Sequence, residues 1–163
     1  MPRWLRNAAV GLATLVGASR PAPANVAVVI PQPVVKEIPD ASLRDVAVAV
    51  YDSLRPVIYY NPELMRRFSP ALDSFFMAHE YAHIALHHTR ASALRAGPGI
   101  RDHLLQAKEL EADCLAARRL GETHRDATLA AVRFFSRMGD ARFDMEHPTG
   151  SERARNILSC MPK

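Results

Sequence analysis

The sequence predicts an α+β domain that is mainly α-helical and carries a small β element. From Ser69 onward, apolar residues recur at helical spacing in segments that are bounded by capping residues, prolines and glycines. Before Ser69 the segments are shorter and contain more valine, tyrosine and proline. A chain of 163 residues is long enough for one domain with a hydrophobic core and too short for two ordinary ones.

The elements predicted before Ser69 are short. Residues 26–30 favour one edge strand within a proline-rich lead-in. Asp40 is expected to cap a helix over residues 42–54, where apolar residues recur on one face, and Pro56 is expected to end it. Residues 57–60, which are Val-Ile-Tyr-Tyr, predict a short strand.

Four helices are expected after this strand. Ser69 and the proline that follows it are typical of a helix N-terminus. Gly121 and Gly139 are expected to end the second and third helices, and Thr149 with Glu152 forms a capping-box pattern before the fourth. The expected ranges are residues 70–89, 101–120, 125–138 and 150–160, with a loop over residues 140–147.

The first 24 residues predict an export signal. Arg3 and Arg6 precede an apolar run of small residues over 8–18, and residues 22–24 form an A-x-A-like cleavage site. The run is shorter than the roughly 20 apolar residues that a permanent membrane span needs, so no such span is expected. The alternative is an uncleaved, disordered amphipathic tail. We expect cleavage near Ala24, export to the periplasm or the exterior, and a mature domain over residues 25–163.

The charge balance argues against a nucleic-acid partner. The formal net charge is +4, but removal of residues 1–24 leaves 18 basic against 17 acidic residues, a net charge of +1. No basic patch with interleaved aromatic residues is present in the sequence. No nucleic-acid partner is therefore expected.

The two cysteines, Cys114 and Cys160, leave two alternatives open. In an oxidising compartment they can form one bridge between the last helix and the middle of the domain. Each can equally be a small buried thiol. Their spacing matches no zinc-binding or redox motif, so neither is counted as a metal ligand.

The most informative segment is His79-Glu80-Tyr81-Ala82-His83, which lies inside an apolar run over residues 75–86. Residues four apart lie on one face of a helix, so His79 and His83 can present two imidazoles to one metal ion. Glu80 can then act as a base on a water molecule that the metal activates. A chance match or a structural histidine pair is the alternative, although unpaired polar groups are costly in a buried helix.

A catalytic zinc needs a third protein ligand and an open position for water. A histidine six residues after His83, following a glycine turn, would indicate the metzincin class, but that position is Thr89. His87 and His88 are expected at the solvent-exposed end of the helix, because one straight helix cannot close three histidines around one ion.

The better candidate for the third ligand is Glu109 on the next helix, which can return antiparallel to the first. Asp113 lies one turn further along and can accept the second N–H of a ligating histidine. Glu111 is expected to face away, as solvent or scaffold. The alternative is that this acidic segment is only a solvated helix face.

H-E-x-x-H followed by E-x-x-x-D resembles the gluzincin zinc peptidases. More narrowly, it is similar to the family that contains the CAAX prenyl proteases and the HtpX-like heat-shock proteases. The resemblance covers residues 75–88 and 109–120 and the tail 147–153, which is similar to the family's H-P-x-x-x-x-R segment. His88 also fits the family's pattern at the end of the metal helix. The resemblance implies a zincin-like fold.

The resemblance further implies one Zn²⁺ ion per chain with defined residues around it. The ligands would be His79, His83 and Glu109, with Glu80 as the base and Asp113 in support of a ligand. His147 would lie near the opening of the zinc site, and Arg153 would pack close to it.

These features together predict a zinc-dependent endopeptidase. Glu80 would take a proton from water and deliver it to the leaving amine, and His147 would donate to the oxyanion. The strand over residues 57–60 is either a peptide-binding edge or a structural edge. The first alternative function is a zinc-binding regulator or sensor of similar fold, and the second is a structural or chaperone-like envelope protein with a decayed site.

Overall fold

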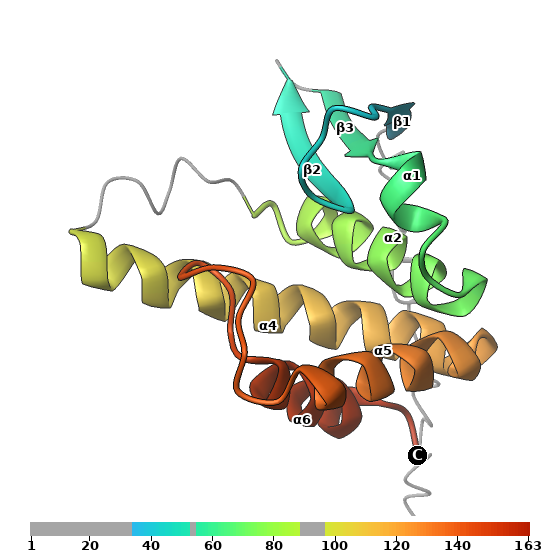
Figure 1. The fold of residues 1–163 in the computed structure, drawn as a ribbon, viewed down its shortest axis with the longest axis vertical. Helices are drawn as coiled ribbons and strands as arrows, with labels where there is room; N and C mark the ends of the chain where they lie inside the picture. The colour runs from blue at the N-terminus through green and yellow to red at the C-terminus, as the bar shows by residue number, and fades with distance from the viewer. Residues whose placement is uncertain (1–33, 53–54, 89–96) are drawn as a thin grey trace, which may run out of the picture. The chain divides into compact units, whose positions relative to one another are not determined.

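The computed structural model describes residues 34–52, 55–88 and 97–163, which form a three-stranded sheet and a larger set of helices (Figure 1). The predicted α+β class with mainly helical content is therefore confirmed. The predicted signal over residues 1–24 and the predicted strand over residues 26–30 lie outside the described residues.

The sheet consists of β1 (Lys36–Pro39), β2 (Ala47–Asp52) and β3 (Arg55–Tyr60). β3 is the central strand, and it pairs in parallel with β1 and antiparallel with β2. The predicted strand over residues 57–60 is therefore confirmed, but its expected position at an edge is wrong. The edges of the sheet among the described residues are β1 and β2.

The prediction of a helix over residues 42–54 is wrong, because Ala47–Asp52 forms β2 instead. The Asp40 side chain accepts hydrogen bonds from the backbone N–H of Ser42 at 2.8 Å and from its hydroxyl at 2.6 Å. These bonds close a turn in place of a helix cap. Alternating valines then favour a strand, because β-branched side chains pack well on a pleated surface. Pro56, expected to end the helix, lies within β3.

Five helices follow the sheet in the described part of the chain. They are α1 (Pro62–Met65), α2 (Pro70–Ala85), α4 (Pro98–Thr123), α5 (Arg125–Met138) and α6 (Gly150–Cys160). Ser69 caps α2 as predicted, since its hydroxyl accepts from the N–H of Leu72. The capping box of Thr149 and Glu152 at the start of α6 is confirmed as well. None of the helices described is both long and apolar enough to cross a membrane.

Gly121 does not end α4, as the sequence analysis expected, because the helix continues to Thr123. A Cβ atom at this position would overlap the ring of Pro162. The glycine therefore serves the close packing of the C-terminal segment against α4, since no other residue leaves room for that ring.

The hydrophobic core lies where α2, α4, α5 and α6 meet, and the sheet covers the opposite side of α2 (Figure 1). Phe75 from α2, Phe135 from α5 and Ile157 from α6 are fully buried there. The aromatic side chains of Phe68 and Phe76 pack edge to face with 5.4 Å between their ring centres. Ala116 and Ala117 of α4 pack into the same core, which holds α4 against α2. The facing surfaces of these two helices carry the candidate site.

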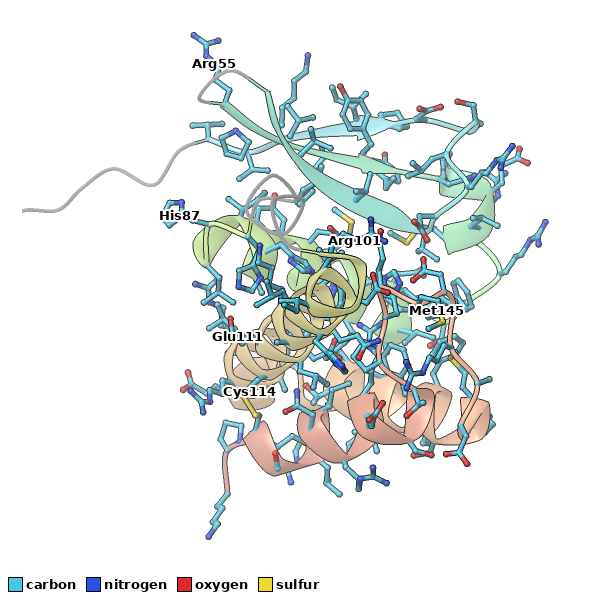
Figure 2. The ribbon with its side chains drawn as sticks, turned by 90° about the vertical axis from the view of Figure 1, so that its left-hand side faces the viewer. Arg55, His87, Arg101, Glu111, Cys114 and Met145 are labelled. Carbon is cyan, nitrogen blue, oxygen red and sulfur yellow. A yellow bond between two sulfur atoms is a disulfide. The ribbon has the colours of Figure 1, made fainter. Side chains whose placement is uncertain are left out.

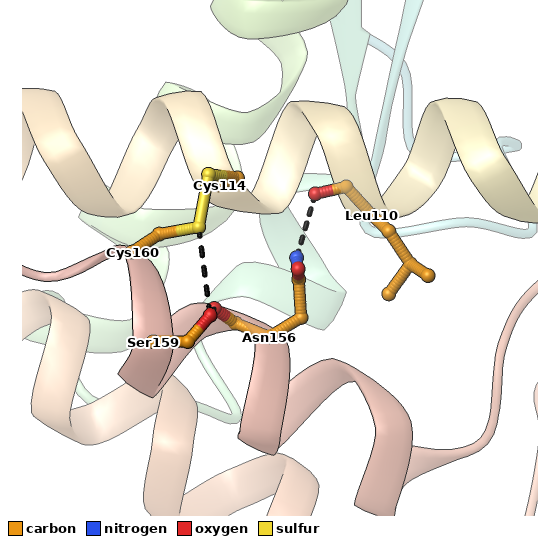
Figure 3. The surroundings of a disulfide bond; sticks show 5 residues. All are labelled: Leu110, Cys114, Asn156, Ser159 and Cys160. Atoms are coloured by element: carbon orange, nitrogen blue, oxygen red, sulfur yellow. Dashed lines mark hydrogen bonds between the residues drawn. A yellow bond between two sulfur atoms is a disulfide. The ribbon is translucent and has the colours of Figure 1, made fainter.

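A disulfide bond joins Cys114 on α4 to Cys160 on α6 (Figure 3). Of the two alternatives that the sequence leaves open, the structure therefore has the bridge. One turn before Cys160, the side-chain amide of Asn156 donates to the carbonyl oxygen of Leu110 at 2.6 Å. The bridge spans 46 residues. In the chain-entropy model, closing such a loop in the unfolded state stabilises the fold by about 4 kcal/mol.

Candidate metal centre

Three predicted ligands come together between α2 and α4. The Nε2 atoms of His79 and His83 lie 3.0 Å apart. A Glu109 carboxylate oxygen lies 3.1 Å from the Nε2 atom of His79, and the other lies 3.2 Å from that of His83. Each residue offers one ligand atom within 4.8 Å of the others, so the group could hold a metal ion.

The outer nitrogen of His79 faces a buried ion pair. Its Nδ1 atom lies 2.9 Å from Oδ1 of Asp113, close enough for an ion pair although outside the alignment of a direct hydrogen bond. Arg153 of α6 donates to both oxygens of this carboxylate, at 2.8 and 2.7 Å. The Arg153 guanidinium also lies 4.1 Å from the ring centre of Phe135. The structure thus places Asp113 and Arg153 in one chain of contacts behind His79.

The charges of the site favour a bound cation. Burial lowers the pKa of His79, but Glu109 and Asp113 outweigh it and raise this pKa to about 10. Burial raises the pKa of Glu109, but His79 and His83 outweigh it and hold this pKa well below its ordinary value. Carboxylates packed against imidazoles therefore attract positive charge, which either a proton or a metal ion supplies.

The outer nitrogen of His83 faces a different partner, His88. Their Nδ1 atoms lie 3.2 Å apart, and Nε2 of His88 lies 3.0 Å from a carboxylate oxygen of Glu111. Burial lowers the pKa of His88, the nearby His83 lowers it further, and Glu111 opposes this shift. The expectation that His88 lies at the solvent-exposed end of the helix is wrong, because its side chain is only 8% exposed.

The backbone at the end of α2 explains how His88 returns to the site. His87 has a left-handed φ of 53°. The N–H of His87 donates to the carbonyl of Ile84, and the N–H of His88 donates to that of His83. These bonds are the Schellman pattern that ends many helices, usually with glycine at the left-handed position. The sequence has histidine there, so the turn gave no glycine signal, and α2 was expected to continue to Thr89.

Glu80, the predicted base, is buried beside the three ligands. One of its carboxylate oxygens accepts from the backbone N–H of Ala49 in β2 at 2.6 Å. Burial raises the pKa of Glu80, and His79 and His83 oppose part of that shift. The role of Ala49 was not predicted, because residues 42–54 were expected to form a helix and only a strand brings the Ala49 amide to Glu80.

His147 lies in the loop between α5 and α6. Its Nε2 atom is 3.7 Å from Glu109, and its Nδ1 atom is 2.8 Å from Oδ1 of Asp144. The same oxygen of Asp144 also accepts the backbone N–H groups of Glu146 and His147. Asp144 therefore shapes the loop and orients the imidazole. This role of Asp144 was not predicted, although an aspartate at the start of a turn is a known turn signal.

A cavity of about 550 Å³ opens over the site. Its walls come from β2, from the first half of α4 and from the loop before α6. Figure 2 labels Arg101 in that part of α4 and Met145 in that loop. The cavity is lined by the three candidate ligands and two further site residues, namely His79, His83, Glu109, Glu80 and His147.

No family model matches the chain, and neither the curated proteins nor the solved structures include one that matches it.

Proposed function

We propose that this chain is a zinc-dependent endopeptidase of the gluzincin class. The observation that carries the proposal is a triangle of three ligand atoms, from His79, His83 and Glu109, with the buried carboxylate of Glu80 beside it. Two nitrogen ligands, one oxygen ligand and a separate carboxylate are the parts that metal-assisted peptide hydrolysis requires.

The separations within the triangle support zinc. Ligands at about 2.0–2.1 Å from a tetrahedral zinc ion are about 3.3 Å apart from one another. The two Nε2 atoms lie 3.0 Å apart, and they lie 3.1 and 3.2 Å from two different oxygens of the Glu109 carboxylate, which is close to that separation. Three protein ligands also leave the fourth position open, which is typical of catalytic zinc and not of structural zinc.

Zinc held by these residues would lower the pKa of a water molecule toward about 7 and polarise the scissile carbonyl. Glu80 would accept the proton of the attacking water and pass it to the leaving amine. The amide of Ala49 holds the Glu80 carboxylate in one orientation. Burial also raises the pKa of Glu80, which suits a group that must take up a proton during the reaction.

His147 would stabilise the negative charge that develops on the carbonyl oxygen. Asp144 accepts a hydrogen bond at Nδ1 of this imidazole, so its Nε2 atom is directed toward Glu109 and the cavity. In its doubly protonated form His147 has a second N–H, at Nε2. An N–H fixed in advance at that position would stabilise the transition state more than the substrate.

The substrate we propose is an extended peptide that binds beside β2, not beside the central strand β3. β2 pairs with β3 along one edge, and its Ala49 amide points to Glu80 on the other. A peptide added as a further strand along this edge would cross the cavity next to the ligands. Main-chain hydrogen bonds would supply much of the affinity.

The disulfide supports the predicted export. Bridges persist in oxidising compartments such as the periplasm and the exterior, and they are rare in the cytosol of mesophiles. We therefore propose that the domain acts outside the cytoplasm, after removal of residues 1–24.

Cleavage of casein by the wild type and by Glu80→Gln, with zinc analysis of both proteins, tests this function. The glutamine can still accept the Ala49 N–H, so the fold and the zinc content should be unchanged. Activity should fall by about 10²- to 10⁴-fold, the usual contribution of a general base.

Equal activity in the two proteins would remove Glu80 from the mechanism. Absence of zinc from the wild type would remove the hydrolase altogether. One zinc ion per chain without cleavage would favour the alternative of a zinc-binding regulator.

A further inference from the structure

The two histidine ligands of the candidate centre have different supports behind them. His79 has the Asp113–Arg153 pair, in which the Asp113 side chain is fully buried. His83 has His88, whose own partner Glu111 is 65% exposed. A role was predicted for Asp113 but none for the residue behind His83.

The contacts of His83 allow one arrangement of protons when a metal is bound. His83 directs Nε2 toward His79 and Glu109, so that nitrogen must be unprotonated to act as a ligand. The proton of neutral His83 then resides on Nδ1, which lies 3.2 Å from Nδ1 of His88. His88 must accept this hydrogen bond and donate its own Nε2–H to Glu111 at 3.0 Å. In this arrangement the N–H groups of His83 and His88 both point away from the metal.

The reverse arrangement conflicts with metal binding. If His88 donated to Nδ1 of His83, neutral His83 would carry its proton on Nε2, at the position of the metal bond. A neutral His88 would then also present a lone pair to the Glu111 carboxylate at 3.0 Å, which is unfavourable. The carboxylate of Glu111 thus selects the tautomer of His88, and His88 selects that of His83.

We propose that His88 is a positioning residue that fixes the tautomer and ring orientation of His83, and that Glu111 completes this relay. The inference rests on the metal centre of the proposed function but not on proteolysis. The turn at His87 supports it independently, because a left-handed φ of 53° is unfavourable for a residue other than glycine. That turn directs the nearly buried His88 imidazole back onto His83.

Zinc affinity tests the proposal without any measurement of cleavage. His88→Leu introduces an apolar side chain of similar size and removes the Nδ1 acceptor. His88→Asn instead has an oxygen near the position of Nδ1, which can accept the same hydrogen bond. Outer partners of ligating histidines contribute about 10- to 100-fold in metal affinity. We expect a loss of that size for His88→Leu, and His88→Asn should recover most of it. His103→Ala removes an exposed histidine of α4 that does not line the cavity, and it should bind zinc like the wild type.

The measurements are competition with a chelating indicator for zinc affinity, the visible spectrum of the Co²⁺-loaded protein and thermal unfolding of the metal-free protein. A changed Co²⁺ spectrum for His88→Leu, with unchanged metal-free unfolding, would indicate an altered ligand and not a damaged fold. If His88→Leu does not fold, Glu111→Ala decides the question. It alters an exposed residue and should weaken zinc binding by about 3- to 10-fold, near the low end for such partners.

Wild-type affinity in His88→Leu, or in Glu111→Ala if that variant must decide, would overturn the relay and leave the proposed metal centre intact. Equal losses in His88→Leu and His88→Asn would overturn hydrogen-bond acceptance as its basis. Absence of zinc from the wild type would overturn the centre and the relay together. Zinc binding by the wild type and the expected losses in the variants, without casein cleavage by the wild type, would overturn only the proposed proteolysis.

Discussion

Replacement of Arg153 by methionine should cost much more stability than replacement of an exposed arginine on the same helix. The Arg153 side chain is 5% exposed and its partner Asp113 is fully buried, so the variant leaves a carboxylate in the core without its cation. Two charge-assisted hydrogen bonds, at 2.8 and 2.7 Å, and the contact with Phe135 are lost together. Breaking a buried ion pair on one side costs about 3–5 kcal/mol, so we expect a loss of about 4 kcal/mol.

Urea unfolding of the metal-free protein at neutral pH measures this loss, and two other variants control it. Arg155→Met alters an exposed arginine of the same helix and should change the stability by no more than about 0.5 kcal/mol. The double variant Asp113→Asn/Arg153→Met removes both charges and should be more stable than Arg153→Met alone. An equal loss in Arg153→Met and Arg155→Met would refute the argument that the buried Asp113–Arg153 ion pair stabilises the fold.

Three further predictions concern stability. His79 has a folded-state pKa of about 10 against 6.5 for the ordinary group, so its contribution is full below about pH 6.5 and is lost as the pH rises toward 10. The urea midpoint of the metal-free protein should therefore fall between pH 7 and 10, and a flat profile would contradict this. Replacing both Cys114 and Cys160 by alanine should lower the unfolding free energy by about 4 kcal/mol in urea titrations, and a change below about 1 kcal/mol would contradict the loop-closure argument. Thr149→Ala removes the cap of α6 and should cost about 1 kcal/mol in thermal unfolding followed by circular dichroism, whereas Thr149→Ser should cost much less.

The helical part of the site was predictable because its signals are local. The spacing of His79 and His83 places them on one face of any helix. Ser69 before a proline and Thr149 three residues before Glu152 are capping signals that depend on few neighbours. Each of these features is encoded within about one helical turn.

The strand β2 was not predictable in the same way. Its valines and alanines fit a helical face as well as an alternating strand, so periodicity alone does not separate the two. Pairing with β3, in which Ala49 lies opposite Ile58, decides the outcome. That pairing depends on the tertiary structure. Because the strand was not predicted, the role of the Ala49 amide, which orients Glu80, was not predicted either.

The contacts of His88 and Asp144 were missed for a different reason. His88 reaches His83 only because His87 adopts a conformation that the sequence does not signal with a glycine. Asp144 matters through a side-chain contact with His147 inside a loop, where no periodic pattern constrains the direction of a side chain. Both contacts follow from the path of the backbone after a helix ends.

The bond between Cys114 and Cys160 has a consequence for damage to the chain. It encloses the loop over residues 140–147, part of which is exposed and which includes His147. A single cut in that loop, by this protein or by another, leaves the two fragments covalently joined. A nicked molecule should therefore migrate as an intact chain on a denaturing gel until a thiol reductant separates the pieces.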